Sequence, residues 1–192
     1  MLDLIKKIRE RTGAGIVAIK KAIEESGGNE EKAIEILRKL GQSKAAKKAE
    51  REAHEGVVIS YVHSNNRVGA LVKLLCETDF VARNEEFQQL AKDIAMHVTA
   101  MNPKFIKPED VSTEIIEKEK EIWREQLANE KKPAEMIEKI MVGKEKKFRE
   151  ESALLTQPFV KNPELTINEL IAEKIGAIGE NIQVGEISRL EL

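Results

Sequence analysis

The spacing of hydrophobic residues changes at Gly56, and this change limits the folds that the chain can adopt. Up to that residue, apolar side chains recur every three or four positions, which is the spacing of one face of a helix. Two runs of mainly β-branched and apolar residues follow, 57–62 and 68–76, with the turn-forming residues 64–67 between them. We therefore predict an α+β fold in which helices precede a β-hairpin.

The end of the sequence supplies a third strand. Ile182 and Val184 alternate with polar residues, the phase slips at Gly185, and it resumes at Ile187. A slip of one residue is typical of a strand that contains a β-bulge. We expect this strand to join the hairpin and complete a three-stranded antiparallel sheet.

A helix that opens at Asn84 is expected to cover this sheet. Asn84 is a favourable N-cap residue, and the acidic Glu85 and Glu86 suit the first turn of a helix. We expect His97, on the same helix, to be half buried. The apolar residues of this helix share one face: Phe87, Leu90, Ile94, Val98 and Met101.

The helical spacing before Gly56 divides into two parts. Three short helices separated by glycines predict a small bundle over residues 1–42, with Gly41 ending its third helix. Residues 43–55 are good helix formers without a large apolar face, so we predict a linker helix there. Residues 56–192 then form the core domain.

The core domain contains two charge-rich helices, which we predict to pack as a protruding antiparallel hairpin over residues 112–150. Residues 130–133 are expected to connect them. The predicted seam between the two helices is a narrow apolar stripe made of Ile115, Ile122, Leu127, Met136, Ile140 and Phe148.

Composition excludes several classes of protein. With 34% charged, 41% hydrophobic and 4% aromatic residues, the chain is expected to be a soluble, helix-rich globule. A formal net charge of -2 disfavours direct binding of nucleic acid. Cys76 is the single cysteine and lies in an apolar run, which predicts a buried free thiol in a reducing compartment. No apolar run approaches the roughly 20 residues of a membrane span, so we expect a cytoplasmic protein without membrane contact.

Catalytic groupings are not apparent in the sequence. The histidines His54, His63 and His97 have no spacing to a serine, cysteine or carboxylate that would suggest a nucleophile and its base. A glycine-rich phosphate loop and the spacing of a zinc site are also lacking. We therefore predict a protein that binds another protein, with no enzymatic activity, no cofactor and no metal.

One stretch is unusual for a connecting segment, namely Thr78 to Asn84, which lies between the second strand and the covering helix. Phe80 is a large apolar ring in a kind of segment that normally runs over the surface. Phe80 either fills the core between helix and sheet or is exposed for a partner, and these residues do not decide between the two. Phe87 already supplies a core aromatic, which weakens the first interpretation.

This stretch resembles the signature of the elongation factor Ts family, bacterial guanine-nucleotide exchange factors for the GTPase elongation factor Tu. Short matching segments extend the resemblance over nearly the whole chain: 9–15, 20–22, 78–84, 94–97, 103–112, 146–148 and 157–160. The resemblance implies a protein that promotes release of GDP during translation elongation and makes or breaks no covalent bond.

The resemblance also implies which residues contact the GTPase. In the family, the Asp-Phe pair wedges beside the nucleotide pocket and disturbs the magnesium and phosphate contacts, and here this pair is Asp79 and Phe80. The residues implied for binding the GTPase are Thr78, Asp79, Phe80, Val81, Ile16, Val17 and His63.

The N-terminal bundle resembles a ubiquitin-associated-like domain, and Ile16 and Val17 stand where the family's bundle touches the GTPase. An exposed apolar pair would be unusual unless a partner covers it. Core packing is an equally good interpretation for Ile16 and a weaker one for Val17, which lies off the apolar stripe. For His63, an ordinary surface position in the hairpin is as good an interpretation as a contact.

Longer members of the family carry two related sheet subdomains, whereas this chain has one. We therefore predict a homodimer that forms a two-plus-two complex with the GTPase. Two alternatives remain: a ubiquitin-associated-like adaptor without exchange activity, and an RNA-binding accessory factor, which the net charge disfavours.

Overall fold

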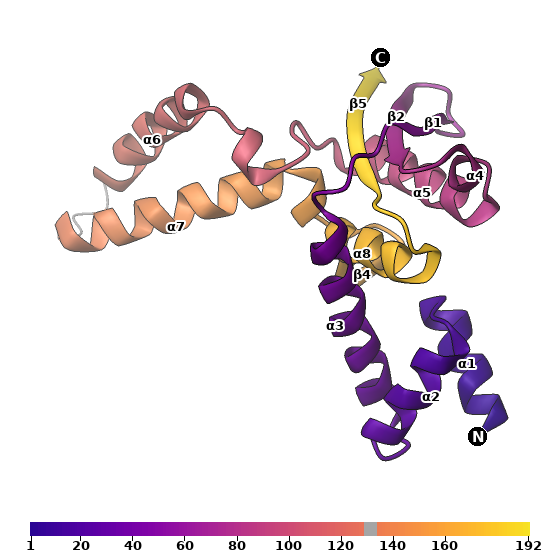
Figure 1. The fold of residues 1–192 in the computed structure, drawn as a ribbon. Helices are drawn as coiled ribbons and strands as arrows, with labels where there is room; N and C mark the ends of the chain where they lie inside the picture. The colour runs from indigo at the N-terminus through magenta and orange to yellow at the C-terminus, as the bar shows by residue number, and fades with distance from the viewer. Residues whose placement is uncertain (129–133) are drawn as a thin grey trace. The chain divides into compact units, whose positions relative to one another are not determined.

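The computed structural model describes residues 1–128 and 134–192, which fold into two compact units (Figure 1). The first unit comprises Met1–Ala100 and Asn168–Leu192, and the second comprises Met101–Ile167. The elements of the first unit, two of which reach just past its limits, are α1 (Leu2–Thr12), α2 (Ile16–Glu25), α3 (Glu30–Lys48), β1 (Glu55–Val62), β2 (Val68–Cys76), α4 (Asp79–Ala82), α5 (Glu85–Met101), α8 (Ile167–Ile178) and β5 (Gln183–Glu191). Those of the second are η1 (Pro108–Asp110), α6 (Thr113–Ala128), α7 (Ala134–Ser152), η2 (Leu154–Thr156), β3 (Pro158–Phe159) and β4 (Asn162–Thr166).

The sheet of the first unit has the strand order β1-β2-β5, and both pairings are antiparallel. Lys73 pairs with Glu186 and Leu74 pairs with Val184, so Gly185 is the extra residue of a bulge in β5. The α+β class, the third strand and the bulge at Gly185 are therefore confirmed. Side chains alternate between the two faces of a strand, so one extra residue shifts the alternation of apolar and polar residues by one position. The bulge could therefore be predicted from the sequence.

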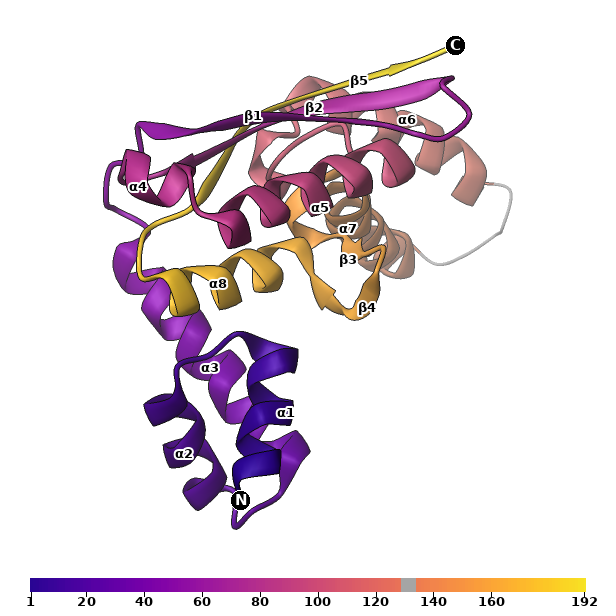
Figure 2. The same ribbon diagram turned by 90° about the vertical axis from the view of Figure 1, so that its right-hand side faces the viewer.

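One face of the sheet is covered by α5, as Figure 2 shows. Arg189 of β5 donates a hydrogen bond to the carbonyl oxygen of Thr99 in α5 at 2.9 Å. Four of the five predicted apolar residues of α5 are buried, but Met101, at the last turn, is exposed. His97 is fully buried, so the expectation of a half-buried position was wrong.

The opposite face of the sheet is exposed. Its outward residues form three rows across the strands, because Val62 lies beside Gly69 and Leu190, Ser60 beside Leu71 and Ser188, and Val58 beside Lys73 and Glu186. The exposed side chains on this face, which we call the open sheet face, are Val58, Ser60, Val62, Leu71, Lys73, Glu186, Ser188 and Leu190.

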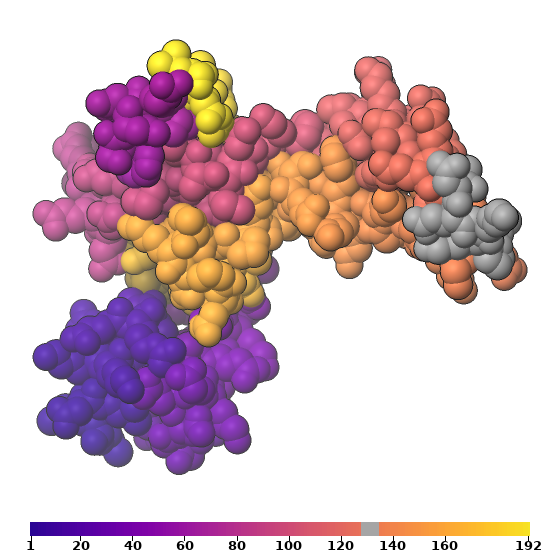
Figure 3. All heavy atoms as spheres, turned by 180° about the vertical axis from the view of Figure 1, so that it is seen from behind, coloured from indigo at the N-terminus to yellow at the C-terminus, as the bar shows by residue number. Residues whose placement is uncertain are grey.

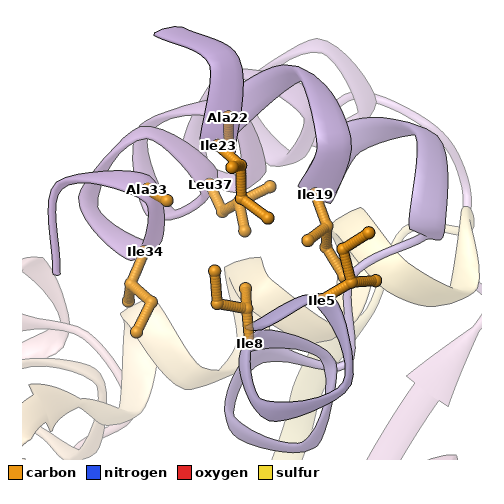
Figure 4. Packing of buried hydrophobic residues seen from close by; sticks show 8 residues of the cluster. All are labelled: Ile5, Ile8, Ile19, Ala22, Ile23, Ala33, Ile34 and Leu37. Atoms are coloured by element: carbon orange, nitrogen blue, oxygen red, sulfur yellow. The ribbon is translucent and has the colours of Figure 1, made fainter. Parts of the chain in front are cut away.

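The helices α1, α2 and α3 enclose a common apolar core, seen in Figure 4. The core draws on all three helices at the spacing of about 3.6 residues per turn that the sequence shows. Its buried members are Ile5, Ile8, Ile19, Ala22, Ile23, Ala33, Ile34 and Leu37. Leu40, which follows Leu37 at helical spacing, is exposed.

The predicted end of a helix at Gly41 and the separate linker helix over 43–55 are wrong. Helix α3 continues through Gly41 to Lys48, and residues 49–54 are not helical. Gly41 is buried, and a Cβ atom added to Gly176 of α8 would lie only 3.2 Å from its Cα atom. This glycine therefore permits the close packing of α3 against α8, and it does not end the helix.

In the second unit, α6 and α7 lie side by side (Figure 3). The rings of Trp123 and Phe148 meet edge to face with centroids 5.9 Å apart, and Lys120 pairs with Glu145 at 3.0 Å. The buried and half-buried residues between the helices are Trp123, Leu127, Ile137, Ile140, Met141 and Phe148.

The predicted seam was correct for Leu127, Ile140 and Phe148 but wrong for Ile122 and Met136, which are exposed. Ile116 is buried in preference to Ile115. The apolar residues of α6 occur in adjacent pairs, so the spacing allowed two phases that differ by one residue. The predicted connection at 130–133 lies outside the described residues.

Candidate protein-binding site

Phe80 is the most exposed aromatic residue among those the structure describes, with 80% of its surface accessible. It lies in the one-turn helix α4 and not in an irregular loop as the sequence suggested. Thr78 is the N-cap residue of α4, and its hydroxyl oxygen accepts a hydrogen bond from the backbone N–H of Val81 at 3.4 Å. A threonine cap followed by an acidic residue favours a helical turn.

Asp79 occupies the first turn of α4 and pairs with Arg83, with 3.0 Å between a carboxylate oxygen and a guanidinium nitrogen. Both side chains are substantially exposed, so the pair contributes little to stability. The carboxylate of Asp79 and the ring of Phe80 are thus neighbours on a capped turn of helix.

The core interpretation of Phe80 is wrong. Phe87 is fully buried beneath the sheet and supplies the aromatic residue of this region, while Ala82 is the buried residue of α4. An 80% exposed phenylalanine forms few contacts within its own chain. An exposed aromatic side chain of this kind is suited to fill a pocket on another protein.

Ile16 and Val17 are the first two residues of α2 and follow Gly15, which is its N-cap. They are 45% and 84% exposed, so neither belongs to the buried core of the bundle. Besides Phe80, the structure therefore offers an exposed apolar pair on another element of the first unit.

His63 is exposed just beyond β1, where its Nδ1 atom lies 3.3 Å from the hydroxyl of Tyr61. It stands at the opposite end of the hairpin from α4, because Glu55 pairs with Cys76 and Val62 pairs with Gly69. Eight residues of strand separate these ends by roughly 25 Å. Thr78, Asp79, Phe80 and Val81 are brought together, whereas His63 is not part of that group.

Glu180 was not predicted as a site residue, yet its carboxylate accepts hydrogen bonds from the chain immediately before α4. Glu180 lies 102 residues from Thr78, and local spacing carries no signal for such a contact. Thr78 itself was identified, but only as a residue of the motif.

Cys76 ends β2 beside this site and is fully buried, as expected. Its thiol donates a hydrogen bond to the carbonyl oxygen of Thr78 at 3.2 Å. Burial, and after it the nearby charge of Glu180, raises the pKa of the Cys76 thiol to about 11. The thiolate is the reactive form, so this cysteine should be inert in the folded protein.

We expect an aromatic disulfide reagent at pH 8 to modify native Cys76 at least about a hundredfold more slowly than the same thiol in urea, since the raised pKa and the burial act together. Absorbance of the released thiolate reports the rate. Equal rates in buffer and in urea would contradict the buried position.

Among residues 1–128 and 134–192, no group of three or more histidine, cysteine, aspartate or glutamate side chains could hold a metal ion. The helices described here include none with both the length and the apolar character that crossing a membrane would require.

Comparison with known proteins shows what class of protein bears this site. A family profile described as "Elongation factor TS" matches residues 3–192. The chain is 58% identical to the elongation factor Ts of Thermosipho melanesiensis, covering 94% of this chain and 92% of that one. It is 52% identical to elongation factor Ts of Carboxydothermus hydrogenoformans and 53% identical to that of Thermodesulfovibrio yellowstonii, with 99% of this chain covered and 88% and 94% of theirs.

The protein is therefore an elongation factor of translation. The resemblance noted in the sequence is confirmed over nearly the whole chain, which belongs to the elongation factor Ts family. Because 88–94% of these three relatives is covered, the length of this chain is close to theirs.

Proposed function

We propose that this chain is a guanine-nucleotide exchange factor that binds the GTPase elongation factor Tu and accelerates its release of GDP. Asp79 and Phe80 are the residues proposed to wedge beside the nucleotide and its magnesium ion. The observation that carries the proposal is the 80% exposure of Phe80 on a capped turn of helix, within a chain of the elongation factor Ts family. Translation elongation takes place in the cytoplasm, so the chain is expected to act there.

The physical basis of exchange is reciprocal coupling between two ligands of one GTPase. If the factor binds the nucleotide-free GTPase more tightly than the GDP-bound form, GDP binds the complex more weakly by the same ratio. Each tenfold change corresponds to about 1.4 kcal/mol. The chain needs no catalytic group for this activity, only contacts that differ between the two states of its partner.

A nucleotide-release measurement tests the proposal directly. Purified elongation factor Tu is loaded with fluorescent GDP, and its release is followed after addition of excess unlabelled GDP with increasing concentrations of this protein. We expect the release rate to rise with the concentration of the factor and then to saturate. A release rate that is independent of the factor would contradict exchange and would favour an adaptor that only binds.

The bundle of α1, α2 and α3 is proposed to act as a ubiquitin-associated-like docking module. Val17 is 84% exposed and Ile16 lies beside it on the first turn of α2, where a partner surface could cover both. The helix pair α6 and α7 is proposed to form the antiparallel hairpin typical of the family.

Val17→Asp should weaken association with the GTPase by at least about tenfold, because a carboxylate replaces an apolar contact in an interface. The rate of GDP release at saturating factor should stay near that of the wild type, since the bundle docks and does not reach the nucleotide. A titration of release rates separates the two quantities. An unchanged half-saturating concentration would contradict the docking role of this residue.

A point substitution is the better test of docking than removal of the bundle. Helix α3 runs without a break from the bundle core to Lys48, where the side-chain amine donates to the carbonyl oxygen of Gly179. Deleting residues 1–41 would cut this helix in its middle and remove the packing of Gly41 against α8, so changes in folding and in docking would be mixed.

The open sheet face is proposed to be the contact between two copies of the chain, as a homodimer that forms a two-plus-two complex. A hollow of about 470 Å³ lies on this face, and its lining includes Val62, Leu71 and Leu190. The face thus carries both apolar side chains and a hollow that can receive them, which suits a two-fold, self-complementary contact. In this arrangement one protomer presents Phe80 and its partner presents the hairpin end near His63.

A further inference from the structure

Glu180 holds the backbone in front of α4 by three hydrogen bonds. One carboxylate oxygen accepts from the N–H groups of Glu77 and Thr78 at 3.1 and 3.0 Å, and the other accepts from the hydroxyl of Thr78 at 2.7 Å. Glu180 follows Gly179, whose φ of 95° lets the chain turn sharply at the end of α8. The side chain therefore reaches α4 from a segment far away in the sequence.

The next residue, Asn181, adds two further hydrogen bonds to the same region. The backbone N–H of Asn181 donates to the carboxylate of Glu77 at 2.7 Å, and its side-chain amide donates to the carbonyl oxygen of Arg51 at 2.7 Å. Arg51 in turn lies 3.4 Å from the Glu77 carboxylate. Asn181 is almost fully buried, so this network is a fixed part of the first unit.

The hydroxyl of Thr78 links Glu180 to the cap of α4. A hydroxyl has one hydrogen to donate and two lone pairs that accept. Because the hydrogen of this hydroxyl is directed to Glu180, a lone pair is directed to the N–H of Val81, which is the capping hydrogen bond. A carboxylate acceptor makes these bonds stronger than neutral ones would be.

A helix of four residues cannot stabilise itself, because a single turn fixes several dihedral angles for very few hydrogen bonds. The direction of α4 must therefore come from its surroundings. Ala82 is the buried residue of the turn, and Phe80 is exposed and makes little contribution. The Glu180 carboxylate is thus the strongest polar anchor at the start of α4.

We infer that Glu180 is a positioning residue for exchange, which orients Asp79 and Phe80 through Thr78. This role rests on the proposed exchange function. Glu180 does not touch the partner itself; it keeps the aromatic ring in one direction before the partner arrives. Such preorganisation lowers the entropy that the complex must lose on forming.

Two substitutions of Glu180 distinguish the loss of its hydrogen bonds from the loss of its charge. Glu180→Ala removes all three hydrogen bonds and should lower the rate of GDP release at saturating factor by about tenfold or more. Glu180→Gln keeps an acceptor for the two N–H groups, and its amide can donate to the Thr78 hydroxyl, so this variant should remain within about threefold of the wild type. Glu35→Ala, which removes a surface pair with Lys39, is the matched control and should have no effect on release.

A double-mutant cycle tests whether Glu180 acts through Phe80. If it does, Glu180→Ala should have no further effect on GDP release in a chain that already carries Phe80→Ala, since there is no ring left to orient. If the loss of release in the double variant instead equals the product of the losses in the two single variants, the inference is overturned. An equal loss of release in the alanine and glutamine variants would also overturn it.

Hydrogen exchange of the free protein separates this inference from the proposed function. Mass spectrometry of the peptide that spans residues 77–84 should show faster amide exchange in Glu180→Ala and nearly unchanged exchange in Glu180→Gln. This readout does not involve the GTPase. If the wild type releases no GDP, the proposed function fails, and if the amides of the alanine variant remain protected, the positioning role fails.

Discussion

Phe80→Ala is expected to reduce the stimulated release of GDP by at least about thirtyfold while leaving the stability of the free chain near that of the wild type. The ring is 80% exposed, so its removal costs the folded chain little. In the complex it would fill a pocket on the partner, and truncation of such an anchor typically costs about 2–4 kcal/mol, which is more than tenfold in rate or affinity. Release of fluorescent GDP and urea denaturation measure the two effects.

The matched control is Phe87→Ala, which changes the same residue type seven positions along the chain. Phe87 is fully buried beneath the sheet, so its truncation should lower the free energy of unfolding by about 3–5 kcal/mol. The folded fraction of that variant should still stimulate release. The wedge proposal is wrong if Phe80→Ala unfolds the protein as Phe87→Ala does, or if it releases GDP at the wild-type rate.

Leu71→Lys is expected to convert a dimer into a monomer. The wild type should sediment at micromolar concentration with a mass near twice the 21.6 kDa of one chain, and the variant with a mass near 21.6 kDa. Leu71 lies in the middle row of the open sheet face, and in a two-fold contact the substitution enters the interface twice. Two buried lysine charges without partners would cost several kcal/mol.

The fold itself should tolerate this change, because Lys73 already occupies the same face two residues along β2. Val142→Lys is the matched control, since Val142 is an exposed valine of α7 and lies outside the sheet. The control should retain the mass of the wild type. A wild-type chain that sediments as a monomer, or a Leu71→Lys variant that remains a dimer, would show that the open sheet face is not the contact.

Local periodicity accounts for the parts of the fold that could be predicted. The bulge at Gly185 followed from a one-residue slip in alternation, and the buried residues of α5 followed from helical spacing up to Val98. Met101 was the exception, because the last turn of a helix can extend past the surface that it covers. The paired apolar residues of α6 left two phases open, and only the packing against α7 selects Trp123 over Ile122.

The remaining differences concern contacts between distant parts of the chain. Gly41 carries the signal of a helix end, and only the approach of α8 shows that it serves close packing. The short strands β3 and β4 were missed because two to five residues are too few for alternation to be recognised. At the candidate site, the sequence motif identified Phe80, but the Glu180 carboxylate that anchors its helix could not be predicted without the fold.

The hydrogen bonds of Glu180 also set an order in time during synthesis of the chain. Thr78 is translated 102 residues before Glu180, so α4 lacks its strongest polar anchor while those residues are being added. The strand β5, which completes the sheet beside β2, is made later still. A chain that stops before residue 180 would therefore carry the Thr-Asp-Phe motif without holding it in a defined direction. Under the proposed function, the chain gains the ability to engage the GTPase only after residue 180 has been made, and we expect a shorter chain to compete poorly with one that contains Glu180.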